Sequence, residues 1–463
     1  MLANSAMRNS PEPSTTADPA WAWAPYQPDA ARPWNLARAA HLFRRATFGA
    51  PWRQLQQALA IGPQRSIDGL LKPEPDLAAF QRQYDGYEAA AAESDSADSL
   101  RGWWLRRMVE TPHPLLEKMT LFWQGHFAAA MAGGASARLI GPHLQLLRTH
   151  ALGRLEPLLR GICRDPVVLA SISAEENYKA RPNEQLARVL LEVFTLGAGG
   201  FSEDDVRETA RALTGWFVVR GQTRYVAREH DDGPKKILGQ EGNWGLDDVV
   251  RIVLAAPATR RRLARRLYRW FVSETDEPGD ELTEPLADAL GPDDDLAKPI
   301  EMILRSNLFF SSAAYRQRIK SPVEYALGIV IALEGRVPTL ELGRDLAALG
   351  QDLLNPPTVK GWVGGRSWLH RFTLAGRSNL ALRLLAGPGT YADKLNPSAV
   401  ARMHSRGGAD ETAKFLLDLF LQGDVTPQAR QMLSAAAPPS GDATEAARRL
   451  AYAIVTLPEF QLA

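Results

Sequence analysis

Apolar residues recur along most of this chain at steps of three and four positions. This spacing places apolar side chains on one face of an α-helix and polar side chains on the other. Strands and helices do not alternate as a parallel sheet requires, and no internal repeat is evident. The clearest apolar series are Leu115, Met119, Phe122, Trp123 and Phe127, followed by Leu144, Leu147 and Ala151.

One short stretch departs from the helical period. Residues 217–219 (FVV) and 224–226 (RYV) flank the polar turn RGQT, which is typical of a β-hairpin. We therefore predict an all-α fold, a multi-helix single large domain, with a minor β-hairpin near 217–226. Two lobes within that domain are the alternative.

The ends of the domain follow from composition and capping signals. Residues 1–33 are rich in Pro, Ala, Ser and Thr, and we expect a disordered tail that docks late through Trp21, Trp23 and Tyr26. Asn35 can cap the first helix, so the helical domain is expected at 34–463. Residues 89–99 (AAAAESDSADS) predict a surface loop.

The clearest local unit covers residues 183–215. Asn183 can cap a first helix, and the glycine-rich loop 197–201 follows it. Ser202, with Asp205 three residues later, resembles a capping box that starts a second helix. Because only five residues separate the helices, we predict an antiparallel αα-hairpin.

Charge and cysteine content exclude several kinds of partner. The 463 residues include 54 Lys and Arg against 53 Asp and Glu, a net charge of +1, which gives no bias toward nucleic acid. The single cysteine, Cys163, cannot form an internal disulfide. The start of the chain lacks the apolar segment of a secretory signal, and no apolar run predicts a membrane span. We expect a soluble, cytoplasmic protein.

Several segments together resemble the bacterial family catalogued as domain of unknown function 1800 (DUF1800). They include HLFRRATFG (41–49), LLEKMTLFWQGHF (115–127), RPNEQLARVLLEVFTLG (181–197) and PPTVKGWVGGRSWL (356–369). The resemblance covers nearly the whole chain and implies a helical fold, but no established reaction. Many relatives resemble exported proteins encoded beside sulfatase-like proteins. The neighbouring sulfatase-like proteins imply a protein partner for the family. The export of relatives makes the periplasm the alternative location for this chain.

Two positions depart from the family's usual motif, which reads roughly P-N-E-N-x-A-R-E. Here Gln185 replaces the second Asn and Val189 replaces the final Glu. If those polar groups form a site in relatives, this chain has lost part of that site.

The helical hairpin carries the first candidate site. Glu184, Arg188 and Glu192 share one helix face at four-residue spacing, and Arg207 and Arg211 share a face of the second helix. The faces can meet as a structural ion-pair network. Alternatively, Glu184 can form part of a catalytic or metal site.

A second candidate follows the hairpin at residues 230–233 (HDDG). His230 and Asp231 can ligate a divalent metal or act as an acid–base pair, with Glu184 as a further catalytic group. A turn held by an Asp side chain is the structural alternative. No other cofactor is indicated, because metalloprotease, Cys/His, Walker and nucleophile-elbow motifs are missing from the sequence.

A third candidate is the glycine-rich, cationic and aromatic segment 360–368. Backbone N–H groups at the start of a following helix could hold an anion, and the tryptophans could stack on a planar or sugar ligand. Tight packing that requires small residues is the alternative. The predicted ligand-binding residues are Lys360, Trp362, Gly364, Gly365, Arg366 and Trp368.

An arginine-rich helix is predicted at residues 260–271. The following segment, 274–295, holds ten acids and no Lys or Arg, so we expect the two segments to neutralise each other. The arginines are Arg260, Arg261, Arg262, Arg265, Arg266 and Arg269.

Two functions remain open from the sequence. The absence of a complete catalytic motif favours a non-catalytic binding or assembly protein. The alternative is a metal-assisted hydrolase acting on a polar substrate, such as a carbohydrate, with the 360–368 segment holding that substrate.

Overall fold

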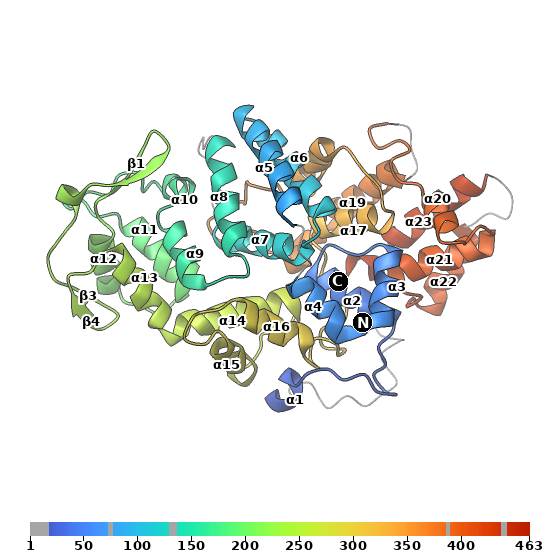
Figure 1. The fold of residues 1–463 in the computed structure, drawn as a ribbon, viewed down its shortest axis with the longest axis horizontal. Helices are drawn as coiled ribbons and strands as arrows, with labels where there is room; N and C mark the ends of the chain where they lie inside the picture. The colour runs from blue at the N-terminus through green and yellow to red at the C-terminus, as the bar shows by residue number, and fades with distance from the viewer. Residues whose placement is uncertain (1–17, 73–76, 129–136, 386–388, 437–441) are drawn as a thin grey trace.

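The computed structural model describes residues 18–72, 77–128, 137–385, 389–436 and 442–463. They form an elongated body of helices with two small antiparallel sheets (Figure 1). The predicted all-α fold with a minor β-hairpin is therefore confirmed. Within these ranges, no helix combines the length and apolar character that crossing a membrane demands.

The N-terminal helices occupy the middle of the body. Leu100, Trp104, Leu115 and Trp123 are fully buried there, so the apolar steps in the sequence do mark the core faces. The helices are α1 (Pro19–Trp23), α2 (Leu36–Ala46), α3 (Trp52–Ile61), α4 (Pro63–Leu71), α5 (Leu77–Glu93), α6 (Ala97–Glu110), α7 (Pro114–His126) and α8 (Ala137–His150).

The predicted boundary of the N-terminal tail is wrong for its described part. Residues 1–17 lie outside the described residues, but α1 already packs on the body. Trp23 and Tyr26 are buried, and Tyr26 N donates to the carbonyl of Arg305 at 2.7 Å. Burial of these aromatic rings offsets the cost of ordering a proline-rich segment. The predicted loop at 89–99 is also wrong, because α5 continues through its alanine run to Glu93.

The next elements form one end of the molecule, which carries both sheets (Figure 1). The predicted hairpin is confirmed as the pair β1–β2, and a second hairpin, β3–β4, was not predicted. The elements are α9 (Leu155–Ile162), α10 (Pro166–Ser171), α11 (Glu184–Arg188), a π-helix (Val189–Thr195), α12 (Glu203–Ala212), β1 (Trp216–Val219), β2 (Gln222–Tyr225), a 3-10 turn (Ala227–Glu229), β3 (Lys235–Ile237), β4 (Gln240–Gly242) and α13 (Leu246–Ala255).

The helix α14 (Pro257–Phe271) connects this end to the middle, with α15 (Asp280–Ala289) packed against it (Figure 1). The following elements are α16 (Ala297–Arg305), α17 (Pro322–Ala332), α18 (Thr339–Ala348), a 3-10 turn (Gly365–Trp368) and α19 (Arg371–Leu385).

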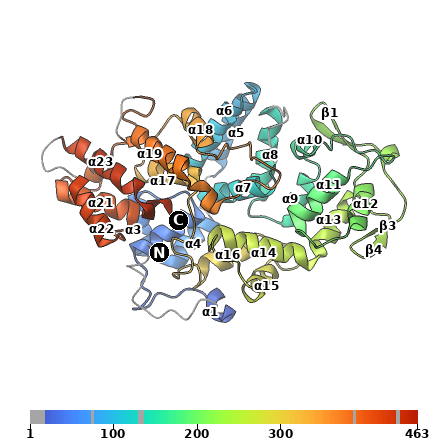
Figure 2. The same cartoon turned by 180° about the vertical axis from the view of Figure 1, so that it is seen from behind.

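The C-terminal helices gather at the end opposite the sheets (Figure 2). They are α20 (Pro397–Met403), α21 (Ala409–Leu421), α22 (Pro427–Ala436) and α23 (Ala443–Thr456), followed by a 3-10 turn (Pro458–Gln461). The last residues return to the middle, where Leu462 pairs with Ile319 in an antiparallel bridge.

Glu117 and Lys118, which are adjacent on α7, hold this helix in place through buried ion pairs. Glu117 Oε1 accepts from Arg107 Nε at 2.6 Å and from Arg148 Nε at 2.8 Å. Burial alone would raise the pKa of Glu117, but Arg148 and Arg107 lower it below its usual value. Lys118 pairs instead with Glu324 of α17. Because an unpaired buried charge is costly, these pairs lock α7 against α6, α8 and α17.

Candidate functional site: a cationic and aromatic pocket

The predicted αα-hairpin is confirmed, and its caps are the predicted ones. Asn183 Oδ1 accepts from Leu186 N at 2.9 Å, and Ser202 with Asp205 forms a capping box. The first helix does not stay α-helical, because residues 189–195 form a π-helix. Thr195 Oγ1 donates to the carbonyl of Leu190, five residues earlier, at 2.7 Å. Such a widened turn is uncommon and is often found beside a functional site.

The charges of the hairpin only partly form the predicted network. Arg188 crosses to α12 and pairs with Glu203 at 2.6 Å, whereas Arg207 pairs with Asp204 on its own helix. Glu184 is exposed and makes no hydrogen bond or ion pair within the described ranges. Among the described charges of the hairpin, the exposed bidentate pair Arg188–Glu203 links the two helices, whose apolar faces are buried in the core.

Arg211 reaches away from the first helix to the loop at 230–233. Its Nε donates to Asp231 Oδ2 at 2.7 Å, and its Nη1 donates to Glu208 Oε2 at 2.8 Å. The hydrogen bond from Arg211 is the main cause that lowers the pKa of Asp231. Arg211 thus holds the loop against α12.

His230 and Asp231 each make hydrogen bonds with nearby groups of the protein. His230 is buried, and its Nδ1 lies 3.0 Å from the carbonyl oxygen of Thr214. Asp231 Oδ1 accepts from Gly233 N at 2.9 Å, which is the predicted turn held by an Asp side chain. Among the residues that the structure describes, no three His, Cys, Asp or Glu side chains cluster as metal ligands do. The metal site at His230 and Asp231 stays a prediction.

Glu192 joins the hairpin to the glycine-rich segment. Its carboxylate Oε1 accepts from Lys360 Nζ at 3.1 Å, across 168 positions of sequence. Two of the segments predicted separately from the sequence therefore meet at this ion pair.

Beside this ion pair lies a cavity of about 480 Å³. One wall is α7, a second is α14, and the third is the segment 358–368. The lining residues are Leu121, Phe122, Gly125, Arg262, Arg266, Arg269, Trp270, Glu274, Arg318, Ser321, Gln351, Thr358, Lys360, Gly361, Trp362, Val363, Gly364 and Trp368. We call this cavity the arginine–tryptophan pocket.

The glycine-rich segment contacts α7 at Gly361. A Cβ atom on Gly361 would lie 2.1 Å from the carbonyl oxygen of Gly125, and its φ is +79°. Only glycine allows both that approach and that backbone conformation. The predicted need for small residues is thus met at Gly361, and the contact holds Trp362 at the wall of the pocket.

Not every predicted residue of the segment faces the pocket. Lys360, Trp362, Gly364 and Trp368 line it, whereas Gly365 and Arg366 do not. Arg366 is exposed. The predicted helix start is a short 3-10 turn, and α19 begins only at Arg371.

The arginines of α14 divide into two groups. The outer group pairs with the acidic segment 274–295, as predicted: Arg260 with Asp294, Arg261 with Glu284, Arg265 with Asp280, and Arg269 with Glu277. Arg262 and Arg266 are outside this group and line the pocket, which Arg269 also lines while paired with Glu277. Sequence reasoning missed this division, although Arg262, Arg266 and Trp270 are spaced by four residues and therefore share a face.

Arg266 is a cation of the pocket for which the described part of the chain provides no anionic partner. Within the described ranges it makes no hydrogen bond or ion pair, and its guanidinium lies 6.0 Å from the centroid of the Phe122 ring. Burial, followed by the charges of Arg262 and Arg269, lowers the pKa of Arg266 to about 10. The side chain therefore stays cationic at neutral pH. Arg262, in contrast, donates to the carbonyl of Val193 in the π-helix at 3.0 Å.

Comparison with known proteins gives a family and no characterised relative. No curated protein and no solved structure matches the chain. A family model with the description "Protein of unknown function (DUF1800)" matches residues 41–462, which is nearly the whole chain. The match covers all three walls of the pocket, namely α7, α14 and the segment 358–368. The chain belongs to the DUF1800 family.

Proposed function

We propose that this protein is a non-catalytic binding protein whose arginine–tryptophan pocket captures a ligand with an anionic group beside a flat or apolar part. The observation that carries the proposal is the partly buried guanidinium of Arg266, which has no hydrogen-bond or ion-pair partner among the described residues. Burying a cation without a partner is costly, and a bound anion would remove that cost.

The aromatic lining supports a flat or apolar part next to the anion. Phe122, Trp270, Trp362 and Trp368 all contribute to the walls. Aromatic faces stack on planar rings and pack on the apolar faces of sugars. An anion recognised by Arg266 would therefore place the adjoining ring or sugar among these side chains.

The polar groups of the pocket favour binding over catalysis. Glu274 is the carboxylate of the lining, and its oxygens accept from Arg318 Nε at 3.1 Å and from Ile319 N at 3.4 Å. Among the described lining residues there is no histidine, cysteine or aspartate. The pocket thus lacks the acid–base pair that hydrolysis commonly uses.

The metal-assisted hydrolase remains the alternative, based on Glu184, His230 and Asp231. Elemental analysis of the purified protein tests it. Stoichiometric metal that is lost in His230→Ala would support the hydrolase, and metal-free protein would contradict it.

Isothermal titration calorimetry with three probes tests the binding proposal. Phenyl phosphate carries both chemical features, inorganic phosphate carries only the charge, and phenol carries only the ring. We expect phenyl phosphate to bind more tightly than either of the other probes. Equal affinity for phenol and phenyl phosphate would contradict a role for Arg266, and release of phenol from phenyl phosphate would contradict a non-catalytic pocket.

The aromatic wall has its own variant and control. Trp362→Ala should weaken phenyl phosphate about three- to tenfold, the range expected for loss of one aromatic contact. The same change should leave inorganic phosphate nearly unaffected. Trp244→Ala, beside β4, is the matched control, because Trp244 stacks on Arg251 and is not part of the pocket lining.

A further inference from the structure

A second, smaller cavity is separated from the arginine–tryptophan pocket by the segment 318–324. Arg318 and Ser321 face the large pocket, whereas Lys320 and Glu324 face the small cavity. Its volume is about 40 Å³, enough for a few water molecules or one small ion. The helices α2, α17 and α21 contribute most of its other walls.

Lys320 brings a cation into this cavity. The residue is only 4% exposed, and within the described ranges its ammonium group has no hydrogen-bond acceptor. Its Nζ lies 3.5 Å from the centroid of the Phe460 ring, which also lines the cavity. An aromatic face is a weak partner for a buried ammonium group, whose three donors normally bind oxygen or an anion.

Arg44 brings a second cation to the same cavity. Its Nη1 donates to Gln422 Oε1 at 2.5 Å, but its buried Nε and Nη2 have no hydrogen-bond partner among the residues that the structure describes. Its guanidinium lies 5.6 Å from the centroid of the Tyr315 ring. Burial and, after it, the charge of Arg44 lower the pKa of Lys320 well below its usual value. An anion between the two groups would therefore favour the protonated, cationic form of Lys320.

The neighbouring carboxylates are already used by other cations. Glu324 lines the cavity, but it pairs with Lys118 and accepts from Arg318 Nη1 at 2.8 Å. Asp424 pairs with Arg316 at 3.2 Å and accepts from Tyr315 at 3.0 Å. Neither carboxylate makes an ion pair with Lys320, so neither of them balances a protonated Lys320 beside Arg44.

We propose that the cavity between Lys320 and Arg44 is a binding site for a small monovalent anion of the size of a halide ion. The anion would accept from Lys320 Nζ and from the free Nε and Nη2 of Arg44. It would compensate the buried positive charge behind the segment that forms one wall of the large pocket. The proposal does not depend on the function proposed for that pocket.

Bromide tests the site directly, because it can be located by anomalous scattering. We expect an anomalous peak between Lys320 and Arg44 in crystals of the full chain grown in sodium bromide. Bromide should also raise the melting temperature relative to gluconate at equal ionic strength. No peak in the cavity would overturn the proposal. A peak without the melting-temperature difference would show an adventitious ion only and would overturn it as well.

Variants separate this site from ordinary salt effects. Lys320→Met should abolish the difference in melting temperature between bromide and gluconate, and Arg44→Gln should reduce it. Lys236→Met is the matched control, because Lys236 is exposed and lines neither this cavity nor the arginine–tryptophan pocket, and it should keep the full difference. An unchanged response in Lys320→Met would contradict the site. If Lys320→Met does not fold, the test rests on Arg44→Gln and on the bromide peak in the unmodified protein. An unchanged bromide response in Arg44→Gln, or no peak in the cavity, would then contradict the site.

Discussion

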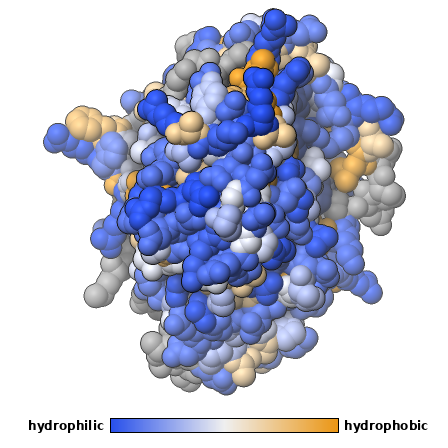
Figure 3. All heavy atoms as spheres, turned by 90° about the vertical axis from the view of Figure 1, so that its left-hand side faces the viewer, coloured by the Kyte–Doolittle hydropathy of each residue, from blue (hydrophilic) through white to orange (hydrophobic). Residues whose placement is uncertain are grey.

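Two charged regions of this protein differ in how their charges are matched. The hairpin and its loop, residues 183–233, sit at an end whose surface is mostly hydrophilic (Figure 3). Arg188, Arg211 and Asp231 there all have ionic partners within hydrogen-bond distance. In the arginine–tryptophan pocket, the partly buried Arg266 has none among the described residues. Exposed charges such as Glu184 need no partner because water solvates them, whereas a partly buried cation without a partner, such as Arg266, indicates a ligand.

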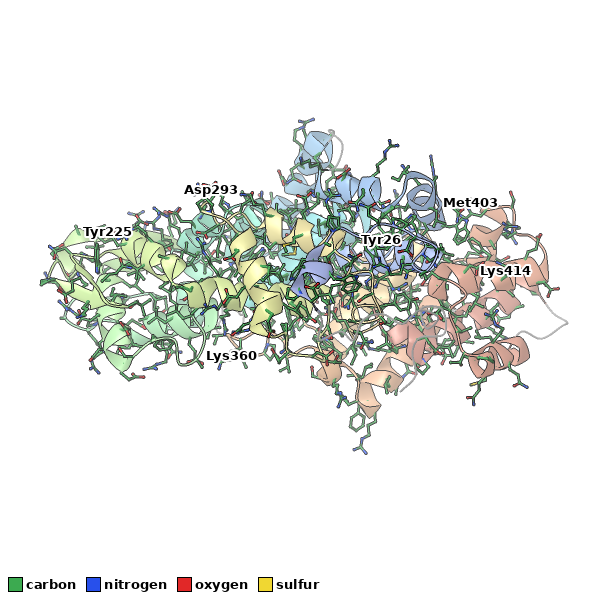
Figure 4. All side chains as sticks on the ribbon, turned by 90° about the horizontal axis from the view of Figure 1, so that it is seen from below. Tyr26, Tyr225, Asp293, Lys360, Met403 and Lys414 are labelled. Carbon is green, nitrogen blue, oxygen red and sulfur yellow. The ribbon has the colours of Figure 1, made fainter. Side chains whose placement is uncertain are left out.

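The two regions are also separated in space. Figure 4 shows Tyr225, at the end of β2, at the tip of the molecule, whereas Lys360 lies well toward the middle. Of the hairpin charges discussed above, Glu192 alone reaches this area, through its ion pair with Lys360. Changes at Arg211 or Asp231, which pair with each other and do not line the pocket, can therefore be made without altering a pocket contact.

The largest effect is expected from Gly361→Ala, which breaks the wall of the pocket. The added Cβ would meet the carbonyl oxygen of Gly125 at 2.1 Å, and φ at this residue is +79°. The segment must move away from α7, so calorimetry should find phenyl phosphate binding weakened by about 100-fold or more, a cost of roughly 3 kcal/mol.

Gly239→Ala is the control for backbone strain alone. Its φ is +80°, and nothing lies within 4 Å of the added Cβ. It should lower the free energy of unfolding by about 1 kcal/mol and leave probe binding unchanged. Similar binding losses in both variants would show that strain, not contact with α7, controls the pocket.

Asp231→Asn should destabilise the hairpin end without affecting the pocket. The change removes one of the two ionic partners of Arg211, since Glu208 stays, and we expect the free energy of unfolding in urea to fall by about 1–2 kcal/mol. Asp232→Asn is the control, because Asp232 is exposed and makes no hydrogen bond or ion pair within the described ranges. A loss of probe binding in Asp231→Asn would contradict the separation of the two regions.

The effect of Asp231→Asn should also depend on pH. The pKa of Asp231 is lowered on folding, first by the hydrogen bond from Arg211, so its stabilisation is present above the unfolded pKa. That unfolded value is about 4. The difference between the variant and the unmodified protein should be complete at pH 7 and should shrink as pH falls below about 4. A difference that stays constant down to pH 3 would contradict this role.

Unlike Asp231→Asn, the change Arg266→Met should not lower the free energy of unfolding. Removing a cation that lacks a partner relieves its desolvation cost, so the free energy of unfolding should stay unchanged or rise by up to about 1 kcal/mol. Arg265→Met, the adjacent control, removes an exposed pair with Asp280 and should change stability by less than about 0.5 kcal/mol. A clear loss of stability in Arg266→Met would show that Arg266 is structural.

The smallest effect is expected from Lys360→Met. Its ion pair with Glu192 is exposed, and such pairs contribute only about 0.2–1 kcal/mol. Dissociation of phenyl phosphate, followed by stopped-flow tryptophan fluorescence, should be about twice as fast because the segment 358–368 loses its tie to the hairpin. The change Glu192→Gln should give the same acceleration. A dissociation rate unchanged in both variants would show that the pair does not hold the pocket closed.

Local signals in the sequence predicted local structure well. Asn183, Ser202 and Asp205 act through groups two or three residues away, so their caps could be read from spacing alone. The pairing of Arg261 and Arg265 with the acidic segment was also predictable, because α14 and α15 are consecutive. The alanine run at 89–93 was misjudged, since alanine favours a helix more strongly than the flanking Ser and Asp favour a loop.

The pocket itself could not be predicted, because its walls come from distant parts of the chain. Phe122 and Trp362 are 240 positions apart (362 − 122), and no pattern relates them. Arg265 and Arg266 are adjacent in sequence, yet one is paired at the surface and the other faces the pocket. The position of α14 between α15, which supplies Asp280 to Arg265, and Phe122 of α7, which Arg266 approaches, decides which of the two has a partner.

Calorimetry of phenyl phosphate with Arg266→Met and Arg265→Met tests the central claim most directly. Loss of one charge-assisted contact is worth about 1.5–3 kcal/mol, so Arg266→Met should weaken binding by about tenfold or more while Arg265→Met binds like the unmodified protein. Equal affinity in both variants would contradict the assignment of this pocket as an anion-binding site.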